Sequence, residues 1–209
     1  AHAQWPWEKI DGNGQLKKEN RNPGTFTEVA SSGSWDVVIA YGSTCSVQVE
    51  ADENLLPYIE NSVESNRLNI KAKKNTNLRS KNRILIYVVL NKLTGLALSG
   101  SGDMKGEGRF DSDAPLRLRL SGSGNIKLSF EKSGKADAME ASISGSGNAD
   151  CAALTVNSAN ARISGSGNLK ISVNKSIKAS ISGSGNVIYK GSADHVESHT
   201  AGSGRVTRG

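Results

Sequence analysis

Ser-Gly-Ser-Gly-Asp at residues 99–103 decides the fold, because near-copies of this phrase recur through the rest of the chain. Successive copies start 22, 23, 20, 18 and 19 residues apart. Self-similarity at such a period is typical of architectures built from stacked repeats. The later copies read Ser-Gly-Ser-Gly-Asn at 121–125, 144–148, 164–168 and 182–186, and Ala-Gly-Ser-Gly-Arg at 201–205.

Apolar and polar residues alternate on both sides of each phrase, which indicates β-strands rather than helices. About twenty residues leave room for two or three short strands, which make one coil of a β-helix. One coil buries too little apolar surface to fold alone, so coils stack. We therefore predict an all-β fold, a parallel β-helix (solenoid) with Ile143, Ile163 and Ile181 in one interior column. The position before each phrase holds Leu98, Leu120, Ile143, Ile163, Ile181 and Thr200.

The phrase itself has the composition of a corner between two strands. Glycine tolerates positive φ and lets backbones approach closely. Serine and asparagine can bond to their own turn backbone, and like residues repeated at one place in every coil can form ladders. A corner with a polar ladder is the simpler interpretation, and a ligand-binding stripe is the alternative.

Composition and order divide the 209 residues into three continuous parts. Aromatic residues make up only 5% of the chain, so we expect a narrow core of Ile, Val, Leu and Ala. Within the second part, alternation predicts a hairpin of residues 35–41 and 45–49, and residues 84–90 should be a strand buried on both faces. The parts are an extended N-terminal lead-in (1–24), an N-terminal β-rich part (25–95) and the repeat coils (96–209).

Features of the chain favour an exported protein. Ala1-His2-Ala3 has the small-x-small pattern of a signal-peptidase site, and no apolar run reaches the ~18 residues of a membrane span. Cys45 and Cys151 both fall at apolar positions of predicted strands. We expect buried free thiols, with a disulfide bridge as the alternative.

The net charge of +6 comes with basic residues at repeated positions. Lys105, Lys127 and Lys170 share a position that should face water, and Arg119 and Arg162 share another. A solvated surface that resists aggregation is the simpler interpretation, and attraction to anionic polysaccharide or lipid is the sharper one. Nucleic acid is not an expected partner, because no binding motif is present and aromatic residues are few.

Residues that could carry chemistry are sparse. Asp111 and Asp113 could form the acidic pair of a pectinase-like hydrolase, and Asp150 is an isolated acid. His195, Glu197 and His199 alternate along one predicted strand and are weak candidates for metal ligands. No dinucleotide, phosphate-loop or nucleophile-elbow motif is complete, so we predict no catalytic residues and no cofactor.

The Ser-Gly-Ser-Gly-Asn series resembles the putative auto-transporter adhesin, head GIN domain family, a secreted bacterial domain of unknown function. Two further stretches are similar, Trp35 to Gly42 and Glu50 to Ile59, the second leading to 66–70. The resemblance covers roughly residues 25–209. It implies a right-handed, single-stranded parallel β-helix, with the N-terminal part packed on its first coils. It also implies an exported protein of a Gram-negative bacterium, whether periplasmic, attached to the outer membrane or extracellular.

These observations predict a non-enzymatic, exported or cell-surface β-solenoid that binds polysaccharide, host matrix or an envelope component. One alternative is a polysaccharide-acting enzyme on the same fold, which would need a groove with at least two carboxylates. The other is a scaffold whose basic face contacts lipid. Exposed end coils also leave homo-oligomers open.

Overall fold

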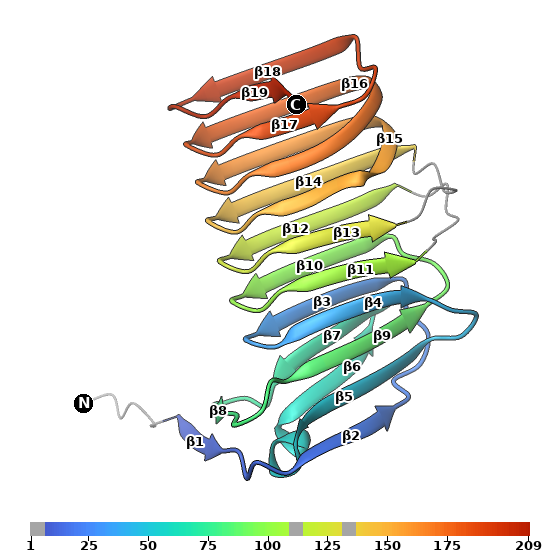
Figure 1. The fold of residues 1–209 in the computed structure, drawn as a ribbon, viewed down its shortest axis with the longest axis vertical. Helices are drawn as coiled ribbons and strands as arrows, with labels where there is room; N and C mark the ends of the chain where they lie inside the picture. The colour runs from blue at the N-terminus through green and yellow to red at the C-terminus, as the bar shows by residue number, and fades with distance from the viewer. Residues whose placement is uncertain (1–6, 109–114, 131–136) are drawn as a thin grey trace.

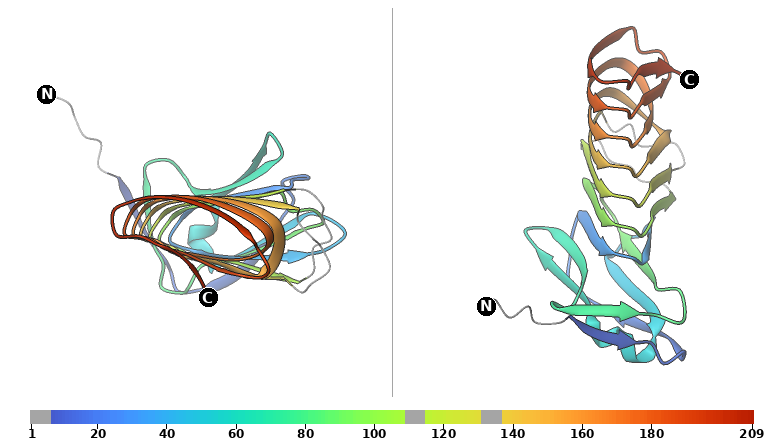
Figure 2. Two further views of the ribbon diagram at one scale, coloured as in Figure 1. Left: turned by 90° about the horizontal axis from the view of Figure 1, so that it is seen from above. Right: turned by 90° about the vertical axis from the view of Figure 1, so that its left-hand side faces the viewer.

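The computed structural model describes residues 7–108, 115–130 and 137–209. It is built almost wholly of strands, with one short 3-10 helix, η1 (Glu53–Tyr58), among the described residues. Seventeen strands join in one continuous sheet, and β1 (Glu8–Asp11) and β8 (Thr76–Arg79) form a separate two-stranded sheet. Seen from above, the large sheet curls into a flattened, nearly closed ring around one core (Figure 2).

The ring has two long walls that meet at the glycine phrases (Figure 1). Strands that precede a phrase form the first wall, and strands that follow a phrase form the second. Two long strands, β15 (Ala149–Gly165) and β16 (Leu169–Gly183), bend from the second wall into the first. The first wall contains β3 (Glu28–Gly33), β10 (Gly95–Gly100), β12 (Leu116–Gly122), β14 (Ala138–Gly145) and β18 (His195–Ala201); the second contains β4 (Asp36–Tyr41), β11 (Met104–Gly108), β13 (Ile126–Phe130), β17 (Val187–Lys190) and β19 (Val206–Arg208).

The N-terminal strands extend both walls of the same sheet. On the first wall, β7 (Arg67–Ala72) pairs with β3, and β6 (Ile59–Glu64) pairs with β7. On the second wall, β9 (Leu85–Leu90) pairs with β4, β5 (Ser46–Asp52) with β9, and β2 (Leu16–Arg21) with β5. Strand pairing therefore crosses residues 24 and 95, which the sequence suggested as boundaries between parts.

The predicted fold class, a right-handed parallel β-helix or solenoid with a β-rich region packed onto it, is wrong. The strands form one mixed sheet with a nearly closed, barrel-like section. Three of its pairs are antiparallel, β2 with β5, β5 with β9 and β6 with β7. The repeats led to this error because they report only local parallel stacking. The strands β2, β5, β6, β7 and β9 carry no such repeated pattern, yet their backbone amides and carbonyls pair with β3 and β4 and with one another and so extend the same sheet.

Within the repeats, the predicted register is confirmed. Ile143 pairs with Ile163, and Ile163 with Ile181, all in parallel strands. All three are nearly inaccessible to solvent and belong to the single hydrophobic core. In the last strand of the first wall, polar Ser198 and Thr200 replace the apolar pattern and are exposed, as expected of a capping repeat.

The second glycine of each phrase is required by close packing of backbones. A Cβ atom on Gly147 would lie 2.0 Å from the carbonyl oxygen of Gly124 in the preceding copy. The first glycine instead needs a positive φ, +126° at Gly145. The Gly147 amide donates to the carbonyl of Gly122 at 3.1 Å, so the corners are bonded to one another directly.

Two local predictions in the N-terminal part are wrong. Residues 35–41 and 45–49 do not form a hairpin, because β9 lies between β4 and β5 and pairs with both. Residues 84–90 are not buried on both faces, since Tyr87 is 37% exposed. The apolar run reflects instead an outer face that keeps partly exposed aliphatic side chains.

Candidate binding faces

The corner between the walls carries a hydrogen-bonded ladder of acidic and amide side chains. In each copy the side-chain oxygen accepts a hydrogen bond from the backbone amide of the equivalent residue in the next copy. For example, Asn148 Oδ1 accepts from the Asn168 amide at 2.9 Å and from its Nδ2 at 3.1 Å. This confirms the predicted polar ladder. It runs through Asp36, Asp103, Asn125, Asn148, Asn168, Asn186 and the amide of Arg205.

The ladder reveals a copy of the phrase that sequence reasoning missed. Ser32-Gly33-Ser34-Trp35-Asp36 pairs in register with the copy at 99–103. Tryptophan replaces the second glycine, and its ring packs in the core with its indole NH donating to Ser31 Oγ at 3.0 Å. Ser32, Gly33, Ser34 and Asp36 match the phrase and could have revealed this copy from the sequence. Trp35, at the position of the second glycine, hid the match.

Arg119 and Arg162 project outward from the first wall and share one column. Arg119 pairs with Ser142, Ser142 with Arg162, and Arg162 with Ser180. The two arginines are thus two strands apart, or about 10 Å. Neither makes an ion pair or side-chain hydrogen bond with another residue that the structure describes. A second outward column beside it is made of serines, Ser32, Ser99, Ser121, Ser144, Ser164 and Ser182.

Shallow hollows open along this surface, which we call the serine face: the outward side chains of the first wall. One has a volume of about 630 Å³ and contains Ser142, Arg162, Ser180 and His199. A second hollow of about 460 Å³ lies beside Glu140 and Lys178, and a third of about 320 Å³ lies toward the N-terminal end. The face therefore combines hydroxyls, unpaired guanidinium groups and room for a ligand.

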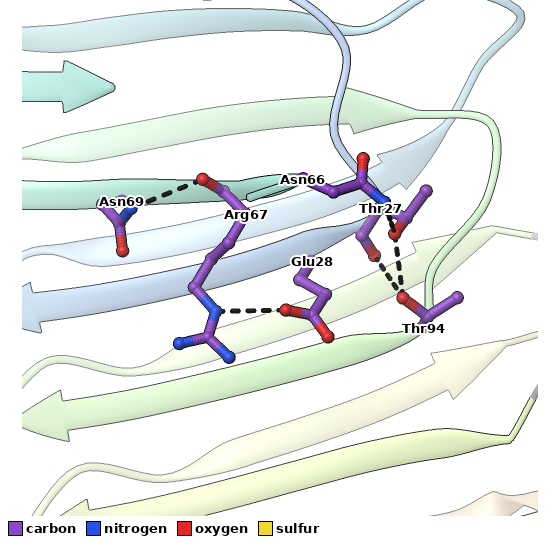
Figure 3. A network of polar contacts seen from close by, with 6 residues as sticks. All are labelled: Thr27, Glu28, Asn66, Arg67, Asn69 and Thr94. Carbon is purple, nitrogen blue, oxygen red and sulfur yellow. Dashed lines mark hydrogen bonds and ion pairs between the residues drawn. The ribbon is translucent and has the colours of Figure 1, made fainter. Parts of the chain in front are cut away.

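The N-terminal end of the serine face is fixed by a polar network (Figure 3). Arg67 Nε donates to Glu28 Oε2 at 3.1 Å, which ties β7 to β3. The hydroxyls of Thr27 and Thr94 lie 2.9 Å apart, and Asn66 Nδ2 donates to Thr27 Oγ1 at 2.8 Å. These bonds hold the segment before β10 against β3 and β7. β10 in turn pairs with β12, the strand that carries Arg119.

The predicted lysines lie on the other wall. Lys105 pairs with Lys127, Lys127 with Asp150, and Asp150 with Lys170, so these four residues form one outward row, the lysine row. The sequence placed the lysines at one repeated position and the arginines at another, and in the structure these two positions lie on different walls. Asp150 is the one acid in this row and lies between two of the lysines.

Within the described residues, the predicted metal candidates do not assemble into a metal site. Among the described residues, no group of three or more His, Cys, Asp or Glu side chains could hold a metal ion. His199 Nε2 lies 3.2 Å from Glu197 Oε1, and Ser180 is its neighbour across the strand pair. The imidazole and carboxylate are 71% and 50% exposed, and Ser180 makes no hydrogen bond with His199. Asp111 and Asp113 lie outside the described residues.

The cysteines are both free, and the described part of the chain contains no helix long and apolar enough to cross a membrane. Cys151 is fully buried, whereas Cys45 is only half-buried just before β5. Burial, with the nearby charge of Asp150, raises the pKa of the Cys151 thiol to about 12. This thiol is therefore protonated and shielded at neutral pH.

Comparison of the sequence with protein families finds a match over the part of the chain that contains most of the repeated phrases and their asparagine ladder. Residues 25–193 match the family described as putative auto-transporter adhesin, head GIN domain. The chain belongs to this family. Membership indicates an exported or cell-surface domain of adhesin type. No curated protein sequence matches the chain.

Solved structures share the fold over almost their full length. A putative adhesin from Bacteroides fragilis has a TM-score of 0.69 and 18% identity, covering 95% of this chain and 99% of its own. A putative lipid binding protein from Parabacteroides distasonis has a TM-score of 0.58 and 23% identity, covering 97% and 100%. A putative adhesin from Parabacteroides merdae has a TM-score of 0.55 and 20% identity, covering 97% and 99%. At these identities the likeness concerns the fold alone.

Proposed function

We propose that this domain is a non-enzymatic adhesin of a Gram-negative cell surface that binds an extended acidic polysaccharide along its serine face. The observation that carries the proposal is the column of Arg119 and Arg162. Both guanidinium groups are exposed, lack partners among the described residues, and stand two strands apart on a rigid sheet.

Guanidinium groups match carboxylates through two parallel hydrogen bonds, which a flexible lysine cannot reproduce. Serine hydroxyls beside them donate and accept, as the hydroxyls of a sugar polymer require. Ser142 and Ser180 make no side-chain hydrogen bond with another described residue, so their hydroxyls are free for a ligand. A polymer lying across the strands would meet the two guanidinium groups two strands apart, with Ser142 between them.

The arrangement favours binding over cleavage. Hydrolysis of a glycosidic bond requires two carboxylic groups held on either side of it. On the serine face Glu140 pairs with Arg117 at 3.6 Å, and Glu197 contacts His199. The 630 Å³ hollow contains no carboxylate, and both glutamates line the 460 Å³ hollow. They stand three strands apart there, about 14 Å, which exceeds the spacing of about 5–9.5 Å between the two acids of a glycosidase. We therefore expect no release of sugar from the bound polymer.

Isothermal titration with polygalacturonate, and with neutral dextran for comparison, tests the proposal. Arg119→Ser with Arg162→Ser should weaken binding of polygalacturonate about tenfold or more. A hydrogen bond between a guanidinium group and a carboxylate of the polymer contributes roughly 1.5–3 kcal/mol when it is fully formed, and the variant loses these bonds. The matched control is Lys127→Ser with Lys170→Ser, which removes the same charge from the other wall.

The control pair should change the affinity less than twofold. Equal losses in both variants would mean that net charge, and not the serine face, attracts the polymer. Equal binding of dextran, or no binding of any acidic glycan or matrix component, would contradict the proposal. Reducing sugar appearing during incubation would favour the enzyme alternative.

A further inference from the structure

We propose that the small sheet of β1 and β8 is a docking tip for anionic lipid surfaces, separate from the serine face. This sheet lies at the N-terminal end of the molecule and forms no strand pairs with the seventeen-stranded sheet (Figure 1). Its position at one end leaves it free to touch a surface while both long walls stay exposed.

Backbone bonds give the tip a defined shape. The amide of Glu8 donates to the carbonyl of Asn75 at 2.9 Å, and the amide of Gly12 donates to the carbonyl of Arg79 at 2.7 Å. Between them, β1 and β8 pair in parallel. Residues 73–76 form a tight turn, since Thr76 Oγ1 donates to the carbonyl of Lys73 at 2.5 Å and Asn75 adopts φ +62°.

The two faces of this small sheet differ in character. Ile10 and Leu78 pair with each other and pack on the main core. Strand alternation places Lys9, Asp11 and Arg79 on the opposite, outward face, and Trp7 directly precedes β1. Trp7 is 66% exposed, more than any other large hydrophobic residue among those described. An exposed tryptophan beside the cations of an anchored strand is the composition of a membrane-interface contact.

The charges around the tip are strongly positive. Five cations gather here against three carboxylates, the exposed Glu8 and Asp11 and the buried Asp52 beside Lys81. All five are exposed, and none makes an ion pair with a described residue. Lys73 also places its ammonium group 5.8 Å from the Tyr58 ring centre. The five are Lys9, Lys73, Lys74, Arg79 and Lys81.

A lipid surface fits this tip better than a single small anion. The cations are spread along two strands and a turn and do not converge on one point, and the tryptophan offers an apolar group that a dissolved phosphate does not use. Lysine and arginine near a membrane gain from its negative surface potential, which decays within a Debye length. Docking should therefore depend on both anionic lipid and salt.

The test is sedimentation of the full chain with phosphatidylcholine vesicles, with or without phosphatidylglycerol. We expect binding only to the anionic vesicles, and loss of binding at high salt. Replacing Lys9, Lys74 and Arg79 by serine should reduce the bound fraction about tenfold or more. The matched control replaces Lys105, Lys127 and Lys170 by serine and should bind as the parent does.

Trp7→Phe provides a second readout. Tryptophan emission of a Trp5→Phe protein should shift to the blue on addition of anionic vesicles, and the shift should be absent when Trp7→Phe is added to it. Failure of the parent to bind anionic vesicles at low salt would overturn the proposal, as would equal binding to neutral vesicles or equal loss in the lysine-row control. If the tip variant instead lost binding to polygalacturonate and not to vesicles, the tip would be part of a glycan site. Arg119→Ser with Arg162→Ser should leave vesicle binding unchanged, so this test and that of the serine face are independent.

Discussion

At the scale of single residues, burial and hydrogen bonding shift the pKa of two buried groups, the carboxyl of Asp52 and the thiol of Cys151. Asp52 is fully buried at the end of β5, and its carboxylate holds the segment that leads into β9. Its oxygens accept from the amide of Lys81 at 2.6 Å and from Asn82 Nδ2 at 2.5 Å. A buried charge is tolerated here because donors surround it.

Asp52→Asn should destabilise the protein by about 1–3 kcal/mol, because the new amide group would face donors in place of accepting from them. Burial would raise the pKa of Asp52, but hydrogen bonds from Lys81 and Asn82 outweigh it and hold the pKa below the usual 3.8. Stability from this group is thus present above its unfolded pKa and is lost as pH falls through its folded pKa.

Urea unfolding from neutral pH down to acid pH measures this contribution. The parent should lose stability more steeply with acid than Asp52→Asn does. Asp194→Asn, at an exposed carboxylate, is the control and should follow the parent. Parallel pH profiles for the parent and Asp52→Asn would contradict the role given to this carboxylate.

The two cysteines should differ in reactivity. Cys151 is buried, with its thiol pKa raised to about 12, so a thiol reagent at pH 8 should reach it only after unfolding. The half-buried Cys45 should react in the native state, although its Sγ lies 3.6 Å from the carbonyl of Phe26. Cys45→Ser should therefore show no native reaction within the time in which the parent loses one thiol. Fast labelling of this variant in the folded state would show that Cys151 is accessible.

At the scale of elements, the corner is the unit on which stacking depends. The second glycine of a phrase faces the carbonyl of the preceding copy, and the asparagine beside it bonds to the next copy. The close contact of Gly147 and the hydrogen bond of Asn148 occur at adjacent residues of one corner. Because each corner joins a strand of the first wall to a strand of the second, both walls have the same spacing between strands.

Gly147→Ala should destabilise the protein by about 3 kcal/mol, because its Cβ would lie 2.0 Å from the Gly124 carbonyl oxygen and the strands must separate. The neighbouring exposed Ser146→Ala is the control and should change stability by no more than about 0.5 kcal/mol. Chemical denaturation of both variants measures the difference. A Gly147→Ala protein as stable as the control would mean that the corner tolerates wider spacing.

At the scale of the whole molecule, one sheet and one core join the N-terminal strands to the repeats. β3 and β4 lie at the junction, because each pairs with an N-terminal strand on one side and with a repeat strand on the other. Nothing in the strand pairing divides the described residues into independently folded parts.

The chain should therefore unfold in a single transition. Fluorescence of Trp35, recorded in a Trp5→Phe, Trp7→Phe protein, reports on the junction, whereas far-ultraviolet circular dichroism reports on all strands. The two urea curves should share one midpoint. Separate midpoints would show that the N-terminal strands and the repeats unfold independently, as repeat arrays with weak interfaces do.

The sequence by itself determined the strands of the repeats, their register and the ladder, because the phrase recurs about every twenty residues and its second glycines from 102 onward stack directly on the preceding corner. It also pointed to the family. Only the tertiary structure decided the mixed, nearly closed sheet, since antiparallel pairing of β5 with β9 joins segments far apart in the chain without any repeated pattern. The same is true of the binding surfaces. Whether Arg162 and Lys170 share a face depends on which wall each strand joins, and the corner between them, at 164–168, sends the chain from one wall to the other.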